Sequence, residues 1–413
     1  MAIASAQSFH AGSSPFDQSL RALDGVNLFV AGILAAFGPF VAVFLGNQGW
    51  SAEQIGLVLS AGGIAALLAQ LPGGELLDAL PSKRLPVAAG TVVIGLAALI
   101  IALWPALVPV ATALVLQGAT GAFLGPAIAS ISLGLVGHDL LGERLGRNQR
   151  FKSIGSLSAA AIFGVIGYFL SNRGIFFAAA ILVLPALAAL ARIRAEDIHF
   201  GRSVGAPDHH HRTRPPCVRR REFRKNRYLL IFAGCLFLFQ LVDAAILPLI
   251  GGELARQEGS AAALVISALV VVPQILVAVL APWAGRQAKS WGRRPLLLVG
   301  FAALPVRALL FALIPDPIVL VAVQILDGVS GTALGVLQPL VVADLTNGTG
   351  RFNLAQGLVG VTSGVGATVS TTVSGFIAAR FGYALGFAAL TVMGVAAVAA
   401  VWLFMPETKP SAR

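Results

Sequence analysis

Two ten-residue stretches, LQGATGAFLG at residues 116–125 and LDGVSGTALG at residues 326–335, share three glycines in register. A second pair, GYFLSNRG at residues 167–174 and GFIAARFG at residues 375–382, shares the glycines at its two ends. The two pairs are offset by 210 and 208 residues, so an offset near 209 residues holds along the chain. Self-similarity at a fixed offset predicts an internal repeat that spans about half of the chain.

The composition indicates that these repeats lie in a membrane. Of the 413 residues, 57% are hydrophobic and 11% are charged, and the mean hydropathy is +0.85. Soluble globular domains contain about 45–50% apolar and about 25% charged residues. Twelve bilayer spans of about 20 residues need about 240 apolar residues, which is close to the number in this chain. The composition therefore excludes a soluble multidomain enzyme, a disordered chain and a disulfide-built secreted module.

Apolar runs long enough to cross a bilayer occur twelve times, six on each side of one long polar insert. Because six is an even number, two six-span repeats keep the same orientation in the membrane and form parallel repeats. We therefore expect an all-α membrane protein with twelve transmembrane helices arranged as two parallel six-helix repeats. The runs cover residues 26–45, 54–73, 86–104, 108–136, 151–170, 174–192, 228–250, 262–284, 295–314, 317–342, 354–378 and 383–405.

The polar insert divides the chain into two halves. We expect an N-terminal six-helix half at residues 1–193, a basic cytoplasmic linker at 194–227, a C-terminal six-helix half at 228–406 and a cytoplasmic tail at 407–413. The linker contains three adjacent histidines, His209–His211, which are more typical of a solvated polar tract than of a metal site. No bound metal is expected.

The positions of Lys and Arg predict the orientation. With the N-terminus in the cytoplasm, 25 of the 29 basic residues fall in inner segments and only Arg173, Arg256 and Arg380 fall in outer loops. Cytoplasmic loops of membrane proteins carry an excess of Lys and Arg. We therefore expect both termini in the cytoplasm and the protein in the inner (plasma) membrane of a bacterium. The net charge of +11 then reflects orientation and contact with membrane lipids, not a nucleic-acid partner.

Two related loop sequences follow the second and eighth apolar runs, GELLDALPSKR at residues 74–84 and GRQAKSWGRRP at residues 285–295. With two six-span halves and a basic central loop, they resemble the major facilitator superfamily, whose signature at this place reads roughly G-x-L-x-D-R-x-G-R-R. Lys289 stands at the acidic position of the second copy, and Pro81 replaces the later glycine of the first. The positions that match or supply the charge are Gly74, Asp78, Lys83, Arg84, Gly285, Gly292, Arg293 and Arg294.

This resemblance implies a secondary transporter that works by alternating access, with the two stretches as gating loops. Asp78 lies at the cytoplasmic end of a predicted helix, where it could pair with basic residues of neighbouring loops in one conformation only. Contacts made in one state only shift the equilibrium between inward-facing and outward-facing arrangements.

Three charged residues lie about ten or more positions inside predicted spans, where a charge is costly and usually faces a cavity or a partner. Asp243, with Gln240 one turn before it, suits proton coupling, because burial favours the protonated carboxyl group and a nearby cation favours the ionised one. Asp327 is a second candidate for proton coupling, and with its repeat partner Gln117 it is a candidate for the cavity wall. Arg307 either extends its charged end towards the membrane surface, pairs structurally, neutralises Asp327 or binds an anionic substrate. The candidates for the substrate cavity are thus Gln117, Gln240, Asp327 and Arg307.

The chain contains no Gly-Lys pair, hence no G-x-x-x-x-G-K-[ST] loop for ATP, and no H-E-x-x-H or C-x-x-C motif. We therefore expect no enzyme activity and no cofactor. An apolar cavity with few fixed charges favours proton-coupled efflux of a small organic molecule by a monomer, driven by the proton gradient. The alternatives are proton-coupled uptake or facilitated diffusion of a metabolite, and a receptor or scaffold that transports nothing.

Overall fold

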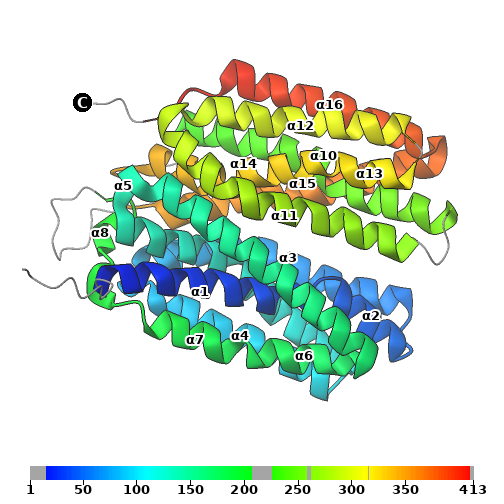
Figure 1. Cartoon of the computed structure of the whole chain (residues 1–413), viewed down its shortest axis with the longest axis horizontal. Helices are drawn as coiled ribbons and strands as arrows, with labels where there is room; N and C mark the ends of the chain where they lie inside the picture. Colours follow the sequence, from blue (N-terminus) through cyan, green and yellow to red (C-terminus); the bar gives the residue numbers. More distant parts are fainter. Residues whose placement is uncertain (1–14, 207–225, 258–261, 315, 410–413) are drawn as a thin grey trace, which may run out of the picture.

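The computed structural model describes residues 15–206, 226–257, 262–314 and 316–409, and no strand occurs among them. Two bundles of long helices lie against each other, the first half of the chain in one and the second half in the other (Figure 1). The tract His209–His211 and Cys217 lie outside the described residues.

In the N-terminal bundle two spans are interrupted and two others are joined into one element. The first span breaks after Ala35 and resumes at Pro39, and the sixth span is divided between two short helices. The fourth and fifth spans form one continuous element that turns at Gly137, where φ is 68° and ψ is −175°. A side chain rarely adopts such a conformation, so a glycine is required there. The helices are α1 Pro15–Ala35, α2 Pro39–Asn47, α3 Ala52–Ala79, α4 Arg84–Leu103, α5 Leu107–Phe169, α6 Asn172–Ile181 and α7 Val183–Ala191.

The C-terminal bundle repeats this order with one break, between α13 and α14. Its helices are α10 Arg227–Gln257, α11 Ala262–Ser290, α12 Arg293–Leu313, α13 Pro317–Val323, α14 Ile325–Thr346, α15 Phe352–Phe381 and α16 Tyr383–Phe404. By length and apolarity, ten helices of the described residues could cross a membrane, with α5 counted once and α15 not counted. The two spans within α5 and the 30-residue α15 bring the number to twelve, which confirms the predicted fold class.

Each bundle has its own apolar core. One core runs from Ala22 to Ile193, and the other runs from Leu229 to Met405 and includes four residues of α5. Large apolar side chains such as Leu184 and Val392 are exposed on the outside of the bundles, as expected where the solvent is lipid. The two halves therefore pack as two separate units that meet mainly through α3 and α5 on one side and α11, α14 and α15 on the other.

The first part of the predicted linker is packed against both bundles at one end of the molecule. It forms a 3₁₀ turn η1, Ala195–Asp197, and a short helix α8, Phe200–Ser203. We call the end of the molecule that carries α8 the linker end and the opposite end the open end (Figure 1).

Backbone hydrogen bonds hold this segment in place. The hydroxyl of Ser130 in the N-terminal half donates to the carbonyl of Ser203 at 2.6 Å. On the other side, the N–H of Phe352 in the C-terminal half donates to the carbonyl of Val204 at 3.2 Å. Ser203 and Val204 are fully buried, so this part of the linker is a structural bridge between the halves.

Candidate functional site

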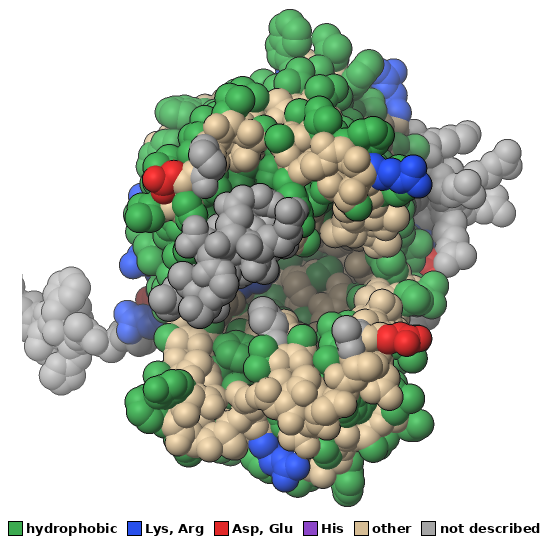
Figure 2. All heavy atoms as spheres, turned by 90° about the vertical axis from the view of Figure 1, so that its right-hand side faces the viewer, with side chains coloured by type: hydrophobic (Ala, Val, Ile, Leu, Met, Phe, Trp, Pro, Cys, Tyr) green, Lys and Arg blue, Asp and Glu red, His purple; other side chains and the backbone are tan. Residues whose placement is uncertain are grey.

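A central cavity of about 360 Å³ lies between the halves and is lined by residues of α1, α3, α5, α14 and α15. Figure 2, seen from the open end, shows the molecule hollowed between the two halves. The sequence predicts an apolar cavity, but the wall contains six amide side chains and one amine. These polar residues are Asn27, Gln70, Asn148, Gln149, Lys152, Gln338 and Gln356.

Towards the linker end the halves meet backbone to backbone. A Cβ atom at Gly74 of α3 would lie 2.5 Å from the carbonyl oxygen of Asn353 at the start of α15. A Cβ atom at Gly285 of α11 would overlap the carbonyl oxygen of Gly142 in α5. Side chains at these two positions would force the halves apart. The structure is therefore closed at the linker end.

Asp78 crosses between the halves at this closure. Its carboxylate accepts hydrogen bonds from the N–H of Asn353 at 3.0 Å, the Nδ2 of Asn353 at 2.8 Å and the N–H of Leu354 at 2.9 Å. These donors belong to the first turn of α15, and the N-terminus of a helix favours a negative charge. The sequence predicts that Asp78 pairs with basic residues, whereas its hydrogen-bond partners here are backbone and side-chain amides.

Lys83 and Arg84 remain within the N-terminal half. The buried Lys83 ammonium donates to carbonyls at the end of α3, including that of Leu80 at 2.8 Å, and lies 4.7 Å from the ring centroid of Phe200 in α8. Burial lowers the pKa of Lys83 to about 8, while the charge of Asp78 acts in the opposite direction. Arg84 donates to the last carbonyl of α7 at 3.4 Å. Lys83 therefore joins the first gating loop to the linker.

The second gating loop holds its own half together. Gly292, with φ of 97°, turns the chain into α12. Arg293 contacts Asp344 of α14 at 2.9 Å, and Glu407 accepts from the N–H groups of Arg293 and Arg294 at 2.8 and 3.1 Å. Partial burial raises the pKa of Glu407, but these hydrogen bonds and the charge of Arg293 outweigh it and lower that pKa overall. The hydrogen bonds of Arg293 and Arg294 thus lie within the C-terminal half, and only the backbone approach at Gly285 reaches the other half in the contacts described above. In the first loop, the Asp78 side chain itself joins the halves.

The three charges inside the predicted spans come together in one cluster. Arg307 of α12 contacts Asp243 of α10 at 2.8 Å and also pairs with Asp327 of α14. The Arg307 side chain is 2% exposed, and those of Asp243 and Asp327 are 30% and 24% exposed. We call these residues the C-terminal cluster. With all three groups ionised, its net charge is −1.

The predicted cavity residues are divided between different places. Gln117 lines a hollow of about 460 Å³ that shares Leu34 and Gly121 with the central cavity. Gln240 packs beside Gly366: a Cβ atom added to Gly366 would lie 3.3 Å from the Cβ atom of Gln240. The lining of the central cavity, as described, includes neither Gln240 nor the C-terminal cluster.

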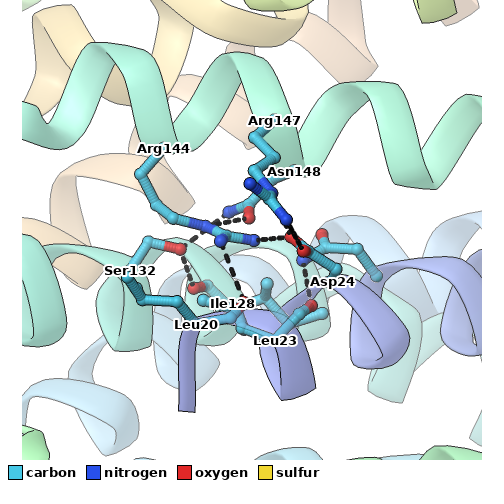
Figure 3. Close-up of polar contacts among 9 residues, drawn as sticks. Leu20, Leu23, Asp24, Ile128, Ser132, Arg144, Arg147 and Asn148 are labelled. Carbon is cyan, nitrogen blue, oxygen red and sulfur yellow. Dashed lines mark hydrogen bonds and ion pairs between the residues drawn. The ribbon is translucent and has the colours of Figure 1, made fainter. Parts of the chain in front are cut away.

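A second charge cluster, which the sequence reasoning missed, lies in the N-terminal half. Figure 3 shows Arg144 and Arg147 of α5 directed at Asp24 of α1, with Arg147 Nη2 2.6 Å from Asp24 Oδ2. Arg144 also donates to Asn148 at 2.8 Å, and Asn148 donates to Ser132 at 2.7 Å. We call Asp24, Arg144 and Arg147 the N-terminal cluster. An acid just before the first apolar run and two arginines in a loop were the available signals.

Lys152 was also missed. The sequence places it among the inner loop charges that set the orientation, but the structure places it in the wall of the central cavity. Its position at the edge of an apolar run gave no sign of whether it faced lipid headgroups or the interior.

Two parallel bundles around a cavity that is closed at one end define a multi-pass membrane transporter. The chain belongs to the Major Facilitator Superfamily, whose sequence profile matches residues 25–255 and 233–413. Two uncharacterized MFS-type transporters of Mycobacterium tuberculosis, from strains CDC 1551 / Oshkosh and ATCC 25618 / H37Rv, are each 36% identical over 398 residues. Each alignment covers 95% of this chain and 94% of the relative.

Solved structures share the fold. The proton:xylose symporter XylE, bound to 6-bromo-6-deoxy-D-glucose, superposes with a TM-score of 0.70 at 16% identity over 96% of both chains. The human organic anion transporter MFSD10 (TETRAN) gives a TM-score of 0.68 at 13% identity over 94% of this chain and 100% of its own. At these identities the likeness concerns the fold alone.

Proposed function

We propose that this protein is a proton-coupled secondary transporter that exports a small organic molecule and binds the coupling proton in the C-terminal cluster. The observation that carries the proposal is the pairing of two carboxylates, Asp243 and Asp327, with one guanidinium, Arg307. Charged groups at membrane depth are costly, and they mark ion pathways in transporters. A proton on either carboxylate brings the net charge of this cluster to zero.

Neutralisation supplies a mechanism of coupling. The side chains of Asp243 and Asp327 are 30% and 24% exposed, while Arg307 is almost fully enclosed, so in this proposal the two carboxylates exchange protons and the guanidinium does not. This cluster is neutral when protonated and charged when deprotonated. Dry surroundings disfavour the charged form, so the cluster binds a proton more tightly there than in wet surroundings. Alternating access changes those surroundings, and a proton therefore biases the exchange between states.

The charge distribution supports an orientation in a bacterial inner membrane with the linker end in the cytoplasm, because 24 of the 29 basic residues then lie inside when Lys152 is assigned to the cavity wall. In this orientation the cavity opens to the outside. Asp78 and the glycine contacts at Gly74 and Gly285 would then stabilise the outward-facing state.

Export by proton antiport is the proposed direction. Apart from its amides and Lys152, the wall of the central cavity consists of glycines and apolar side chains, which suits an amphipathic compound. Uptake with a proton, the alternative, uses the same cluster in the opposite sense. Function as a monomer, without a cofactor or a nucleic-acid partner, stays a prediction.

Proteoliposomes with an imposed pH gradient test the function. A panel of amphipathic anions, cations and neutral compounds is added while an acridine dye reports proton movement and each compound's flux is measured. We expect flux coupled to protons in the wild type, and downhill exchange without uphill accumulation in Asp243→Asn. The matched control is Asp139→Asn, because Asp139 is an exposed acid outside the cluster.

Three outcomes would contradict parts of the proposal. Uphill accumulation that survives in Asp243→Asn removes the coupling role of this residue. Proton-driven accumulation towards the cytoplasmic side reverses the direction to uptake. Absence of flux across the whole panel favours the receptor or scaffold.

A further inference from the structure

Lys152 is the one charged residue in the described lining of the central cavity, and it is exposed to the cavity space. No hydrogen bond or ion pair joins its ammonium group to any other described residue. Asp24 of the N-terminal cluster, one acid in the same half, is already held by Arg144 and Arg147. The protein therefore presents an ammonium group to the cavity without a counter-charge of its own.

Amide side chains share the cavity wall with this ammonium. Gln149, Gln338 and Gln356 also line the cavity, and no hydrogen bond joins their side-chain amides to other described residues. Each amide offers one acceptor oxygen and two donor hydrogens, and the ammonium offers three donors. The cavity thus offers hydrogen-bond donors from both halves of the molecule, and its one ammonium group has no acidic partner in the described lining.

Closure of the open end makes the missing counter-charge decisive. In the present state, water can solvate Lys152 through the open cavity. Once both ends are closed during alternating access, an isolated ammonium would be enclosed at membrane depth, where charges are paired or costly. An anion bound beside it removes this cost, because charge-assisted hydrogen bonds in a dry site are strong.

We propose that the central cavity binds a small amphipathic organic anion whose carboxylate, phosphate or sulfonate group pairs with Lys152 while Gln149, Gln338 and Gln356 hydrogen-bond its polar atoms. Transport of this anion rests on the proposed function, whereas binding of the anion does not. A cavity of about 360 Å³ lies at the lower end of the size range of small-molecule sites. Apolar residues of the same wall, such as Val30 and Leu334, contact the remainder of the molecule.

An anionic substrate also agrees with export. A bacterial membrane potential, negative inside, drives an anion outwards and a proton inwards, so both movements of an antiporter run downhill in the electric field. Uptake of the same anion would have to overcome that field.

Binding is tested with matched pairs at constant ionic strength, using purified full-length protein in nanodiscs. The probes are 1-naphthalenesulfonate with 1-naphthalenesulfonamide, 1-naphthoate with 1-naphthamide, and 1-naphthyl phosphate. We expect at least one anion to raise the unfolding midpoint of the wild type while its neutral partner does not. Lys152→Met should weaken the binding of that anion by about tenfold or more, and Lys152→Arg should restore the binding. The proposal would be overturned if anions and their neutral partners shifted the unfolding midpoint equally, or if an anion shifted the midpoints of wild type and Lys152→Met equally. It would also be overturned if no anion shifted the midpoint of the wild type.

A ligand-free measurement tests the same charge without a substrate. Spin labels at Arg173→Cys and Ile318→Cys, two exposed positions at the open end of opposite halves, report closure in a background without Cys217 and Cys235. We expect Lys152→Met to raise the population with a closed open end by about tenfold or more relative to the wild type. An unchanged distance distribution would overturn the proposal.

The two proposals fail in different ways. Anion binding that depends on Lys152 but gives no flux would leave this site standing and remove the proposed function. If wild type and Lys152→Met showed equal proton-coupled flux of neutral compounds, the proposed function would stand and the anion site would be removed.

Discussion

Each half of the molecule contains a cluster of three charges that is at least partly buried, and the two clusters have opposite composition. The N-terminal cluster joins one acid, Asp24, to two arginines, while the C-terminal cluster joins one arginine, Arg307, to two acids. An arginine keeps its charge at any physiological pH, so the first cluster keeps its net charge of +1. In the proposed function, one of the two carboxylates beside Arg307 takes up a proton, and this changes the net charge of the C-terminal cluster.

The two clusters are not copies of each other. At the repeat offset, Ala98 and Gln117 occupy the N-terminal positions that correspond to Arg307 and Asp327. The N-terminal cluster contacts the cavity wall through Asn148, whereas the C-terminal cluster lies outside that wall. Under the two proposals above, the N-terminal half binds the substrate through Lys152 and the C-terminal half binds the proton.

The largest effect is expected at Arg307. Arg307→Gln leaves two partly buried carboxylates side by side, and loss of one partner of a buried ion pair costs about 3 kcal/mol or more. We expect a large drop in the unfolding midpoint, measured by tryptophan fluorescence, and loss of coupled transport. The double variant Arg307→Gln with Asp327→Asn should recover part of the stability but not the coupling. Equal stability of the single variant and the wild type would contradict the ion-pair geometry.

The next effect concerns the contact between the halves. Asp78→Asn removes the charge that caps α15 and leaves at most one good acceptor oxygen. The closed arrangement of the linker end should therefore lose roughly 2 kcal/mol of stability relative to the open one. We expect Ala355→Cys, fully buried in α15, to become reactive towards an impermeant maleimide in this variant. Asp139→Asn is the control. Unchanged labelling would show that Asp78 does not hold this end closed.

The sequence predicted the fold well because twelve apolar runs and a fixed repeat offset each constrain the same answer. It also selected Asp243, Arg307 and Asp327, since a charge within an apolar run is conspicuous. It did not reveal that they meet, because their spacing of 20 and 64 residues encodes no contact between helices. Lys152 and the cavity glutamines were missed for a different reason. An uncharged amide, or a lysine at the end of a span, looks the same whether it faces the cavity or the surface.

A smaller effect is expected in the N-terminal cluster, where two arginines share one acid. In Arg144→Gln, Asp24 retains Arg147, so the charge is still compensated and the loss should be about 1–2 kcal/mol, below that of Arg307→Gln. Arg147 is 52% exposed, and Arg147→Gln should cost less still. Unfolding midpoints of the variants give the order. A loss at Arg144 as large as at Arg307 would remove the contrast between the two clusters.

The last effect is a pH dependence at Lys83, which is spread over a pH interval. Burial lowers the pKa of Lys83 to about 8, so between about pH 8 and its ordinary pKa the folded protein holds fewer protons here than the unfolded chain. Stability from this residue therefore rises with pH in that window, by at most about 1.4 kcal/mol per pH unit, and is constant below it. The measurement is the difference in unfolding midpoint between wild type and Lys83→Met from pH 7 to 10. A difference that moves against the wild type as pH rises would mean that the carbonyls of α3 and the ring of Phe200 stabilise the charged amine more than burial opposes it.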